Sequence, residues 1–370
     1  MNLVHMHLMN IFSFRTLLSA LFVMPSLLFA QYSVSTFAGS DSGFVNGKLA
    51  ESKFNGSFGI CIDKDGNLYI ADSGNNCIRK INTDGVVSTF AGTGKAGNLD
   101  ADRLSATFNS PTGICTDNNG NFYVADFLNH TIRKIDDEGI VTTLAGSGQP
   151  GFADGFADEA QFNFPRGIAI DGFGNLFVGD SWNHRIRKIT PDGNVTTYAG
   201  GGNDIGPDSK GSCVDGPADK ARFFTPCGVA CDLYGNVYIA DALNHKIRKI
   251  DNYGNVSTVA GTSESGWNNG GYFDGDYKSA ILNTPTELCI SFDEDIYFSD
   301  TFGNRVRKLS FDGTVTTVAG DGTPGFLDGN GTLSKFNYPR GITLDNAENK
   351  IYVIDSKNFK VRVITTELKD

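Results

Sequence analysis

The chain has 370 residues, of which 40% are hydrophobic, 11% aromatic and 20% charged, a composition typical of globular proteins. Its formal net charge of −11 disfavours a nucleic-acid partner, because such a surface would have to neutralise many phosphates. The seven cysteines form no C-x-x-C pair and no His/Cys cluster with zinc-site spacing, so we expect no metal and no other cofactor.

Residues 1–30 are predicted to be a signal peptide. They contain no Asp or Glu, one basic side chain at Arg15, and an apolar stretch from Leu17 to Ala30. This stretch is too short for a helix that crosses a bilayer of about 30 Å, and no second apolar stretch of spanning length follows. We therefore expect a mature chain that begins near Gln31, has no membrane span, and is secreted or periplasmic.

The mature chain opens with a predicted strand, Val34-Ser-Thr-Phe-Ala-Gly39, and six copies of a longer unit follow. The first copy holds four predicted strands, at residues 59–63, 67–72, 78–81 and 86–92. They are rich in β-branched and aromatic residues and are separated by turns such as Asp-Gly and Gly-Asn, which is the pattern of an antiparallel meander.

Two polar residues mark every copy. The strand that corresponds to residues 67–72 ends each time in an aspartate, namely Asp72, Asp126, Asp180, Asp241, Asp300 and Asp355. Seven positions later comes an arginine, namely Arg79, Arg133, Arg187, Arg248, Arg307 and Arg362. Because they recur in every copy, we interpret these residues as structural: the Asp caps a tight turn and pairs with the Arg across it.

Six such units predict an all-β fold, a six-bladed β-propeller of four-stranded antiparallel blades over residues 31–370. The last copy stops after Lys360-Val-Arg-Val363 and lacks its fourth strand, whereas the segment from Val34 to Gly39 resembles that strand. We therefore expect the N-terminal strand to join the last blade and to remove the free edge of the sheet.

The segment Asn67-Leu-Tyr-Ile-Ala-Asp72, with Ile-Arg-Lys-Ile after it, resembles the NHL-repeat family, and the likeness covers residues 34 to 364. The family's Asn-His-Leu is approximated at Asn129-His130, Asn183-His184 and Asn244-His245. The resemblance implies a propeller but no particular chemistry, since the family includes partner-binding, RNA-binding and enzymatic members. A zinc site of the three histidines is disfavoured, because each occupies the same turn of its own blade.

Candidate binding residues are those that differ between equivalent positions. The residue before the glycine of the innermost strand is Phe58, Thr112, Arg166, Cys227, Thr286 or Arg340. Blades three and six lie opposite, so we expect Arg166 and Arg340 to face each other across the channel mouth, with Thr112 and Thr286 as a second opposed pair. Two planar guanidiniums suit a carboxylate or a sulfate. The alternative is that each Arg binds carbonyls of its own loop.

Two tryptophans and two cysteines complete the candidates. Trp182 lies in a turn and Trp267 in an insertion on the loop-rich face; they suit sugar or peptide binding or, alternatively, cover the core. Cys213 and Cys227 flank the longest insertion and are candidates for a disulfide in an oxidising compartment, provided that their Cβ atoms lie within bonding reach.

The function that we favour from the sequence is a non-catalytic scaffold that binds a protein or glycan on the loop-rich face. The alternative is a propeller hydrolase or lyase, resembling gluconolactonase or the amidating lyase, with a metal at the axis. The inner strands offer mostly Gly, Ile, Cys, Ala and Thr, which are poor metal ligands. A third hypothesis is a passive spacer in a surface assembly.

Overall fold

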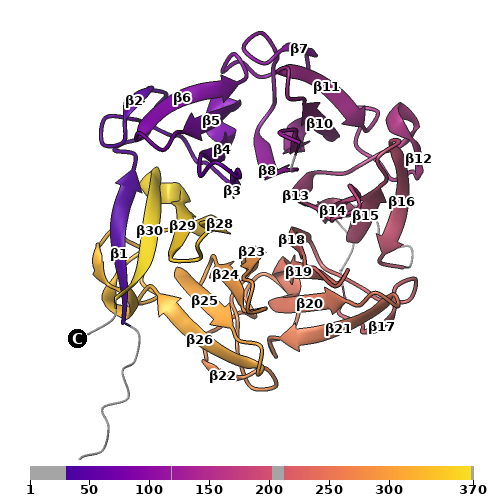
Figure 1. The fold of residues 1–370 in the computed structure, drawn as a ribbon. Coiled ribbons are helices and arrows are strands. Elements are labelled where there is room, and N and C mark those ends of the chain that lie inside the picture. The colour runs from indigo at the N-terminus through magenta and orange to yellow at the C-terminus, as the bar shows by residue number, and fades with distance from the viewer. Residues whose placement is uncertain (1–30, 118, 202–211, 368–370) are drawn as a thin grey trace, which may run out of the picture.

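The computed structural model describes residues 31–117, 119–201 and 212–367. They form six β-sheets that radiate as blades from a central axis (Figure 1). The helices of this part of the chain are single 3-10 turns of three residues. The predicted all-β, six-bladed propeller is thereby confirmed.

The bounds of the elements follow the repeat. Blade one contains β2 (Gly47–Lys48), β3 (Ile60–Ile62), β4 (Leu68–Asp72), η1 (Ser73–Asn75), β5 (Cys77–Ile81) and β6 (Val86–Ala91). Blade two contains β7 (Ala101–Asp102), β8 (Pro111–Thr116), β9 (Phe122–Asp126), η2 (Phe127–Asn129), β10 (Thr131–Ile135) and β11 (Ile140–Ala145). Blade three contains β12 (Gly155–Phe156), η3 (Ala157–Glu159), β13 (Pro165–Ile170), β14 (Leu176–Asp180), η4 (Ser181–Asn183), β15 (Arg185–Ile189) and β16 (Asn194–Ala199).

The second half repeats this order. Blade four contains β17 (Gly216–Pro217), β18 (Pro226–Cys231), β19 (Val237–Asp241), η5 (Ala242–Asn244), β20 (Lys246–Ile250) and β21 (Asn255–Ala260). Blade five contains β22 (Gly275–Asp276), β23 (Pro285–Ile290), β24 (Ile296–Asp300), β25 (Arg305–Leu309) and β26 (Thr314–Ala319). Blade six contains β1 (Gln31–Ala38), β27 (Gly329–Asn330), η6 (Gly331–Leu333), β28 (Pro339–Leu344), β29 (Lys350–Asp355), η7 (Ser356–Asn358) and β30 (Lys360–Glu367).

Each sheet has five strands, not the predicted four. In blade one the order is β2-β6-β5-β4-β3, so that β3 lies at the axis and β2 at the rim. The additional strand is only two residues long and pairs with the outer strand through Gly47↔Val87 and Lys48↔Val86. It belongs to the long connection that precedes each inner strand, and two residues are too few to show an alternating pattern in the sequence.

The N-terminal strand closes the ring, as predicted. The sheet of blade six has the order β27-β1-β30-β29-β28, so β1 lies between two strands from the other end of the chain. Val34 pairs with Ile364 of β30 on one side and with Gly329 of β27 on the other. Figure 1 shows the indigo β1 beside the yellow β30. The pairing removes the open edge that blade six would otherwise expose.

Apolar side chains fill the boundaries between neighbouring blades. One cluster joins Ile78 of blade one to Phe122 and Val124 of blade two. The closing boundary is filled in the same way, by Ile60 and Ile70 of blade one with Ile354 of blade six. Because burying a side chain of this size contributes about 1.5–3 kcal/mol, these clusters are the main stabilising feature of the ring.

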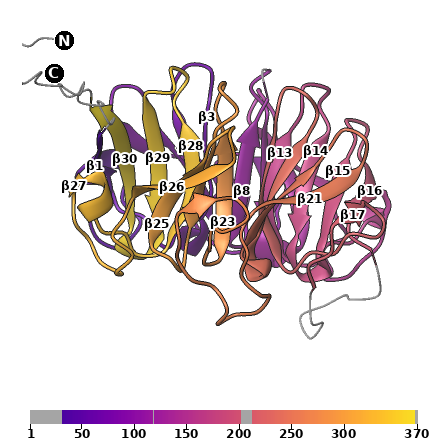
Figure 2. The same cartoon turned by 90° about the horizontal axis from the view of Figure 1, so that it is seen from below.

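The two ends of the ring differ (Figure 2). The hairpin between the two innermost strands of each blade lies on one end, which we call the turn face. The 3-10 turns that follow the conserved aspartates lie on the other end, the loop face, together with the long connections between blades. The connection between β21 and β22 projects from this loop face in Figure 2. In the part of the chain that the structure describes, no helix has the length and apolar character needed to cross a membrane.

Candidate functional site

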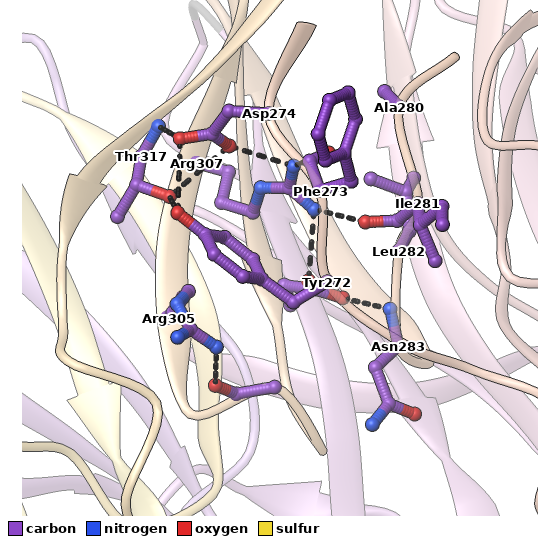
Figure 3. Close-up of polar contacts among 12 residues, drawn as sticks. Tyr272, Phe273, Asp274, Ala280, Ile281, Leu282, Asn283, Arg305, Arg307 and Thr317 are labelled. Atoms are coloured by element: carbon purple, nitrogen blue, oxygen red, sulfur yellow. Dashed lines mark hydrogen bonds and ion pairs between the residues drawn. The ribbon is translucent and has the colours of Figure 1, made fainter.

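The repeated Asp and Arg residues form buried ion pairs within each blade. In blade five, Arg307 donates from Nη1 to the Ile281 carbonyl at 2.7 Å and to Asp300 at 3.2 Å. Its Nη2 donates to the Phe273 carbonyl and to Asp274, both at 2.7 Å (Figure 3). The guanidinium therefore ties the incoming connection to the strands of its own blade.

The same arrangement recurs around the ring. The Asp–Arg distances are 3.0 Å for Asp72–Arg79, 2.9 Å for Asp126–Arg133, 2.8 Å for Asp180–Arg187, 2.8 Å for Asp241–Arg248, 3.2 Å for Asp300–Arg307 and 2.7 Å for Asp355–Arg362. All of these side chains are buried, and both terminal nitrogens of every one of these arginines donate to partners within the protein. The Nε atom of each arginine has no partner but is buried as well, so none of these donors is open to a ligand.

The histidines of the turns join neighbouring blades. The Nδ1 atoms of His130, His184 and His245 accept hydrogen bonds of 3.1, 3.0 and 3.0 Å from backbone N–H groups in the next blade. Asn76 and Asn304 perform the same task with their side-chain oxygens in two other blades. The three histidines lie in separate blades, and within the described ranges no three His, Cys, Asp or Glu residues are grouped as metal ligands.

The two threonines predicted at the mouth are bonded inside its wall. The Thr112 hydroxyl donates to the carbonyls of Ala125 and Arg166 at 3.3 and 3.2 Å. The Thr286 hydroxyl lies 2.5 Å from that of Thr301. Both threonines are buried, so they connect adjacent strands and leave little hydroxyl surface for a ligand.

Arg166 and Arg340 come from opposite blades and meet at one aromatic ring. Their guanidinium carbons lie 5.6 and 4.4 Å from the centroid of Phe58, which belongs to blade one. Arg166 also lies 5.1 Å from the ring of Phe127, and its Nη1 is 4.0 Å from the sulfur of Cys227. Among the described residues no carboxylate forms an ion pair with either guanidinium, and neither donates to a backbone carbonyl. Both guanidinium groups therefore lie close to the ring of Phe58.

Glu287 is a further residue of this site, and the sequence reasoning missed it. It occupies the position that the other inner strands fill with Gly59, Gly113, Gly167, Gly228 and Gly341. These glycines allow the inner strands to approach closely, since a Cβ at Gly167 would lie 2.3 Å from the carbonyl oxygen of Cys227. At Gly228 a Cβ would lie 2.7 Å from Glu287 Cα, so the glutamate backbone packs directly on that glycine.

The carboxyl group of Glu287 is in an unusual environment. Its Oε1 atom is buried and has no hydrogen-bond partner in the described part of the chain. Desolvation by the surrounding protein raises the pKa of Glu287 to about 8, and the Leu288 N–H and the Arg166 charge offset this only in part. Burial and the like charge of Arg166 lower the pKa of Arg340 to about 10. At neutral pH the mouth therefore carries two cations and a largely protonated carboxyl group.

Aromatic side chains flank this mouth on two sides. Phe164 packs against Phe127 and Trp182 with ring centroids 4.8 and 4.1 Å apart. On the far side, Trp267 stacks on Phe302 at 6.5 Å and is 63% exposed. Trp182 is thus partly covered by the aromatic group around Phe164, whereas Trp267 presents most of its surface to solvent.

The predicted disulfide is not formed in the structure, where Cys213 and Cys227 are both free. Cys227 lies in the inner strand β18 beside Arg166, whereas Cys213 lies close to the Asp241–Arg248 pair of blade four. Burial raises the pKa of both thiols. The two cysteines flank one insertion in the sequence, but its ends reach different parts of the blade.

The chain matches family models for NHL propellers. Residues 59–81, 108–135, 162–189 and 336–364 match the NHL repeat, and residues 189–323 match the teneurin NHL domain. NHL repeat-containing protein 2 of Gallus gallus is 27% identical over 351 residues, which are 84% of this chain and 46% of that protein. The chain spans less than half of the length of the curated relatives that it matches.

Solved structures resemble the fold. An auxiliary nutrient binding protein from Bacteroides ovatus superposes with a TM-score of 0.67 at 20% identity, covering 92% of this chain and 78% of that one. A gluconolactonase from Xanthomonas campestris gives a TM-score of 0.57 at 13% identity, covering 93% of this chain and 94% of that one. At such low identity these likenesses concern the fold alone.

Proposed function

Because the chain belongs to the NHL-repeat family, we propose that it is an exported binding propeller that holds a protein or glycan on its loop face and catalyses no reaction on it. The observation that carries this proposal is the pair of guanidiniums at the axis. Arg166 and Arg340 share the ring of Phe58 and have no carboxylate partner in the described residues. Charged donors of this kind, with aromatic rings beside them, suit the capture of a ligand with acceptor groups.

The chemistry of the axis supports binding over catalysis. The one thiol at the mouth, Cys227, has its pKa raised by burial, so it is a poor nucleophile at neutral pH. The inner strands bring one carboxyl group, that of Glu287, to a place where an axial metal would need several oxygen ligands. The auxiliary nutrient binding protein is a precedent for a binding role in this fold; what the two proteins share is the fold.

One observation favours the enzymatic alternative. Glu287 has a pKa of about 8 in a partly enclosed position, and carboxyl groups with such raised pKa values act as general acids in some enzymes. A gluconolactonase shares the propeller fold. Metal analysis of the isolated protein and assays with lactones and phosphoesters discriminate between the two functions.

Export is part of the proposal and rests on residues 1–30, which lie outside the described residues. The closing strand β1 begins at Gln31, so cleavage just before this residue would leave the whole strand in the mature chain. A signal peptide that is removed there is therefore compatible with ring closure.

The test uses the mature chain from Gln31 in a glycan array and in a pull-down from the native culture medium. We expect a ligand that is retained by the wild type and lost in the double variant Arg166→Gln/Arg340→Gln. Lys64→Gln is the control, since this exposed cation belongs to the turn face. A stoichiometric metal together with metal-dependent hydrolysis would overturn the proposal in favour of an enzyme.

A further inference from the structure

We propose that the axial mouth, formed by Phe58, Arg166, Glu287 and Arg340, recognises a sugar acid: its carboxylate lies on the two guanidiniums and a neighbouring hydroxyl on Glu287. This inference rests on the proposed function, because it names the chemistry of the ligand for the same face. It depends on three features of the mouth, namely unused donors, an unused acceptor and an apolar ring beside the donors.

The unused donors belong to Arg166 and Arg340. Arg133, one of the repeated arginines, shows how a guanidinium with both terminal nitrogens bonded looks in this chain. It donates to the Thr107 carbonyl at 2.9 Å, to Asp126 at 2.9 Å and to Asp100 at 2.5 Å. Arg340 has no hydrogen bond in the described part of the structure, and Arg166 has only the weak contact of 4.0 Å with Cys227. Two like charges beside one ring repel each other, and a carboxylate that bridges them would relieve that repulsion.

The unused acceptor is Oε1 of Glu287, which is buried without a partner. Leaving such an atom unpaired costs free energy, and a hydroxyl of the ligand would satisfy it. The charged and titratable groups that interact with this carboxyl are Arg166 from β13, Cys227 from β18 and Cys289 on its own strand. Arg340 from β28 interacts with Arg166 and Cys227 of the same group. Since Glu287 is mostly protonated at neutral pH, it does not repel an anionic ligand there.

The apolar ring selects among anions. Phe58 is 3% exposed and its ring centroid lies 5.6 and 4.4 Å from the two guanidinium carbons, so the donors are held against an apolar wall. A ligand that carries an apolar face close to its carboxylate matches this wall. A uronic acid has a carboxylate, an adjacent ring hydroxyl and a face of C–H groups within one small ring. A simple carboxylate lacks the hydroxyl, a neutral sugar lacks the charge, and the side chain of an acidic peptide has no hydroxyl beside its carboxylate.

The experiment is calorimetric titration of the mature chain with D-glucuronate, D-glucose, acetate and a tri-glutamate peptide at pH 7. We expect glucuronate to bind about tenfold or more tightly than each of the other probes, since it alone satisfies donors and acceptor together. Arg340→Gln should weaken glucuronate by about tenfold to a hundredfold, and Lys64→Gln should leave it unchanged.

A second variant isolates the glutamate. Glu287→Gly restores the residue that the other blades carry, so the fold is expected to persist, as circular dichroism and the melting temperature will report. In this variant the preference for glucuronate over acetate should largely disappear. In the wild type the affinity should fall as the pH rises above about 8, where Glu287 ionises and repels the ligand, and in Glu287→Gly it should stay level.

Each other outcome has a distinct meaning. Equal binding of glucose and glucuronate, preference for the peptide, or indifference to Arg340→Gln would overturn the sugar-acid assignment. If the glycan array or the pull-down still finds a ligand on the loop face, the binding function stands although the axial assignment has failed. If a tight ligand is found that is turned over, both proposals fail.

Discussion

The Nδ1 atom of His245 accepts a hydrogen bond of 3.0 Å from the backbone N–H of Thr284, which joins blade four to the chain that enters the inner strand of blade five. The other ring nitrogen, Nε2, lies 2.6 Å from the carbonyl oxygen of Gly266. These two contacts together require the neutral ring with its proton on Nε2. The histidine that resembles the family motif is thus a connector between blades, in a backbone position with φ of 53°.

Loss of this connection should destabilise the ring. His245→Phe, which installs the residue found at the equivalent position Phe359, removes the acceptor and should lower the free energy of unfolding by about 1–3 kcal/mol. His245→Asn should retain most of the stability, because Asn304 accepts the equivalent bond from Tyr338 at 3.2 Å. Denaturant unfolding measures both variants. Equal losses in the two would contradict the assigned role of the acceptor.

Acid should weaken the same connections. Burial lowers the pKa of His130 and of His245 below the ordinary value, so the unfolded chain binds protons more tightly than the folded chain at these sites. Their contribution to stability is therefore present at neutral pH and is lost as the pH falls below about 6.5. The melting temperature at pH 7 and pH 5 tests this. In the double variant His130→Asn/His245→Asn the difference between the two pH values should shrink.

The buried carboxylates should matter more than the exposed ones. Asp126 and Asp100 both pair with Arg133, but the Asp126 side chain is fully buried and that of Asp100 is 44% exposed. Asp126→Ala should destabilise the protein by about 3–5 kcal/mol, because it leaves a buried cation with less compensation. Asp100→Ala should cost less than about 1 kcal/mol. Similar losses for both variants in chemical denaturation would refute this ranking.

The closing strand offers a matched pair of substitutions on its two faces. Val34 is 1% exposed, whereas its neighbour Ser35 is exposed. Val34→Asp places an unpaired charge in the closing sheet and should destabilise the fold by about 3 kcal/mol or more, with aggregation through the opened edge. Ser35→Asp should behave like the wild type. Light scattering during a thermal ramp and size-exclusion chromatography follow both properties.

Mass spectrometry of the exported protein tests the predicted signal peptide, residues 1–30. When the full chain is expressed in its native host, the exported product should begin near Gln31 and lack the first thirty residues. Leu21→Arg, which interrupts the apolar stretch, should leave unprocessed protein inside the cell. Export of the uncleaved chain, or unchanged processing of the variant, would show that this segment is not a signal peptide.

Sequence periodicity was sufficient for most of the fold. The repeated Asp and Arg gave the number of blades, and the likeness of residues 34–39 to the fourth strand gave the closure by β1. The outermost strand of each blade was not predicted, because a two-residue strand such as Gly47–Lys48 is defined by its pairing with a neighbouring strand and has no sequence pattern of its own.

The candidate site was predictable only in part. The positions of Arg166 and Arg340 follow from the symmetry of the ring, but their shared contact with Phe58 does not follow from the repeat pattern. Glu287 was not predicted because it replaces the repeat glycine itself, whereas the candidate residues came from the position before that glycine. Thr112 and Thr286 occupy the same repeat position as the two arginines. Their side chains are short, however, and their hydroxyl groups bond to neighbouring strands and do not extend into the mouth. The predicted disulfide between Cys213 and Cys227 is wrong, because closeness in sequence does not determine the distance between two Cβ atoms in a repeat fold.

The use of β1 as a strand of the last blade also determines the order of events during synthesis. The first residues of the mature chain find their partner only when Lys360–Glu367 has been made, which at about 5–20 residues per second is roughly 15 to 65 seconds later. Until then the nascent protein has an unfinished ring with two unpaired sheet edges. Completion is therefore a late, long-range step, and a ribosome that stalls within the final repeat would release a product that is unable to close.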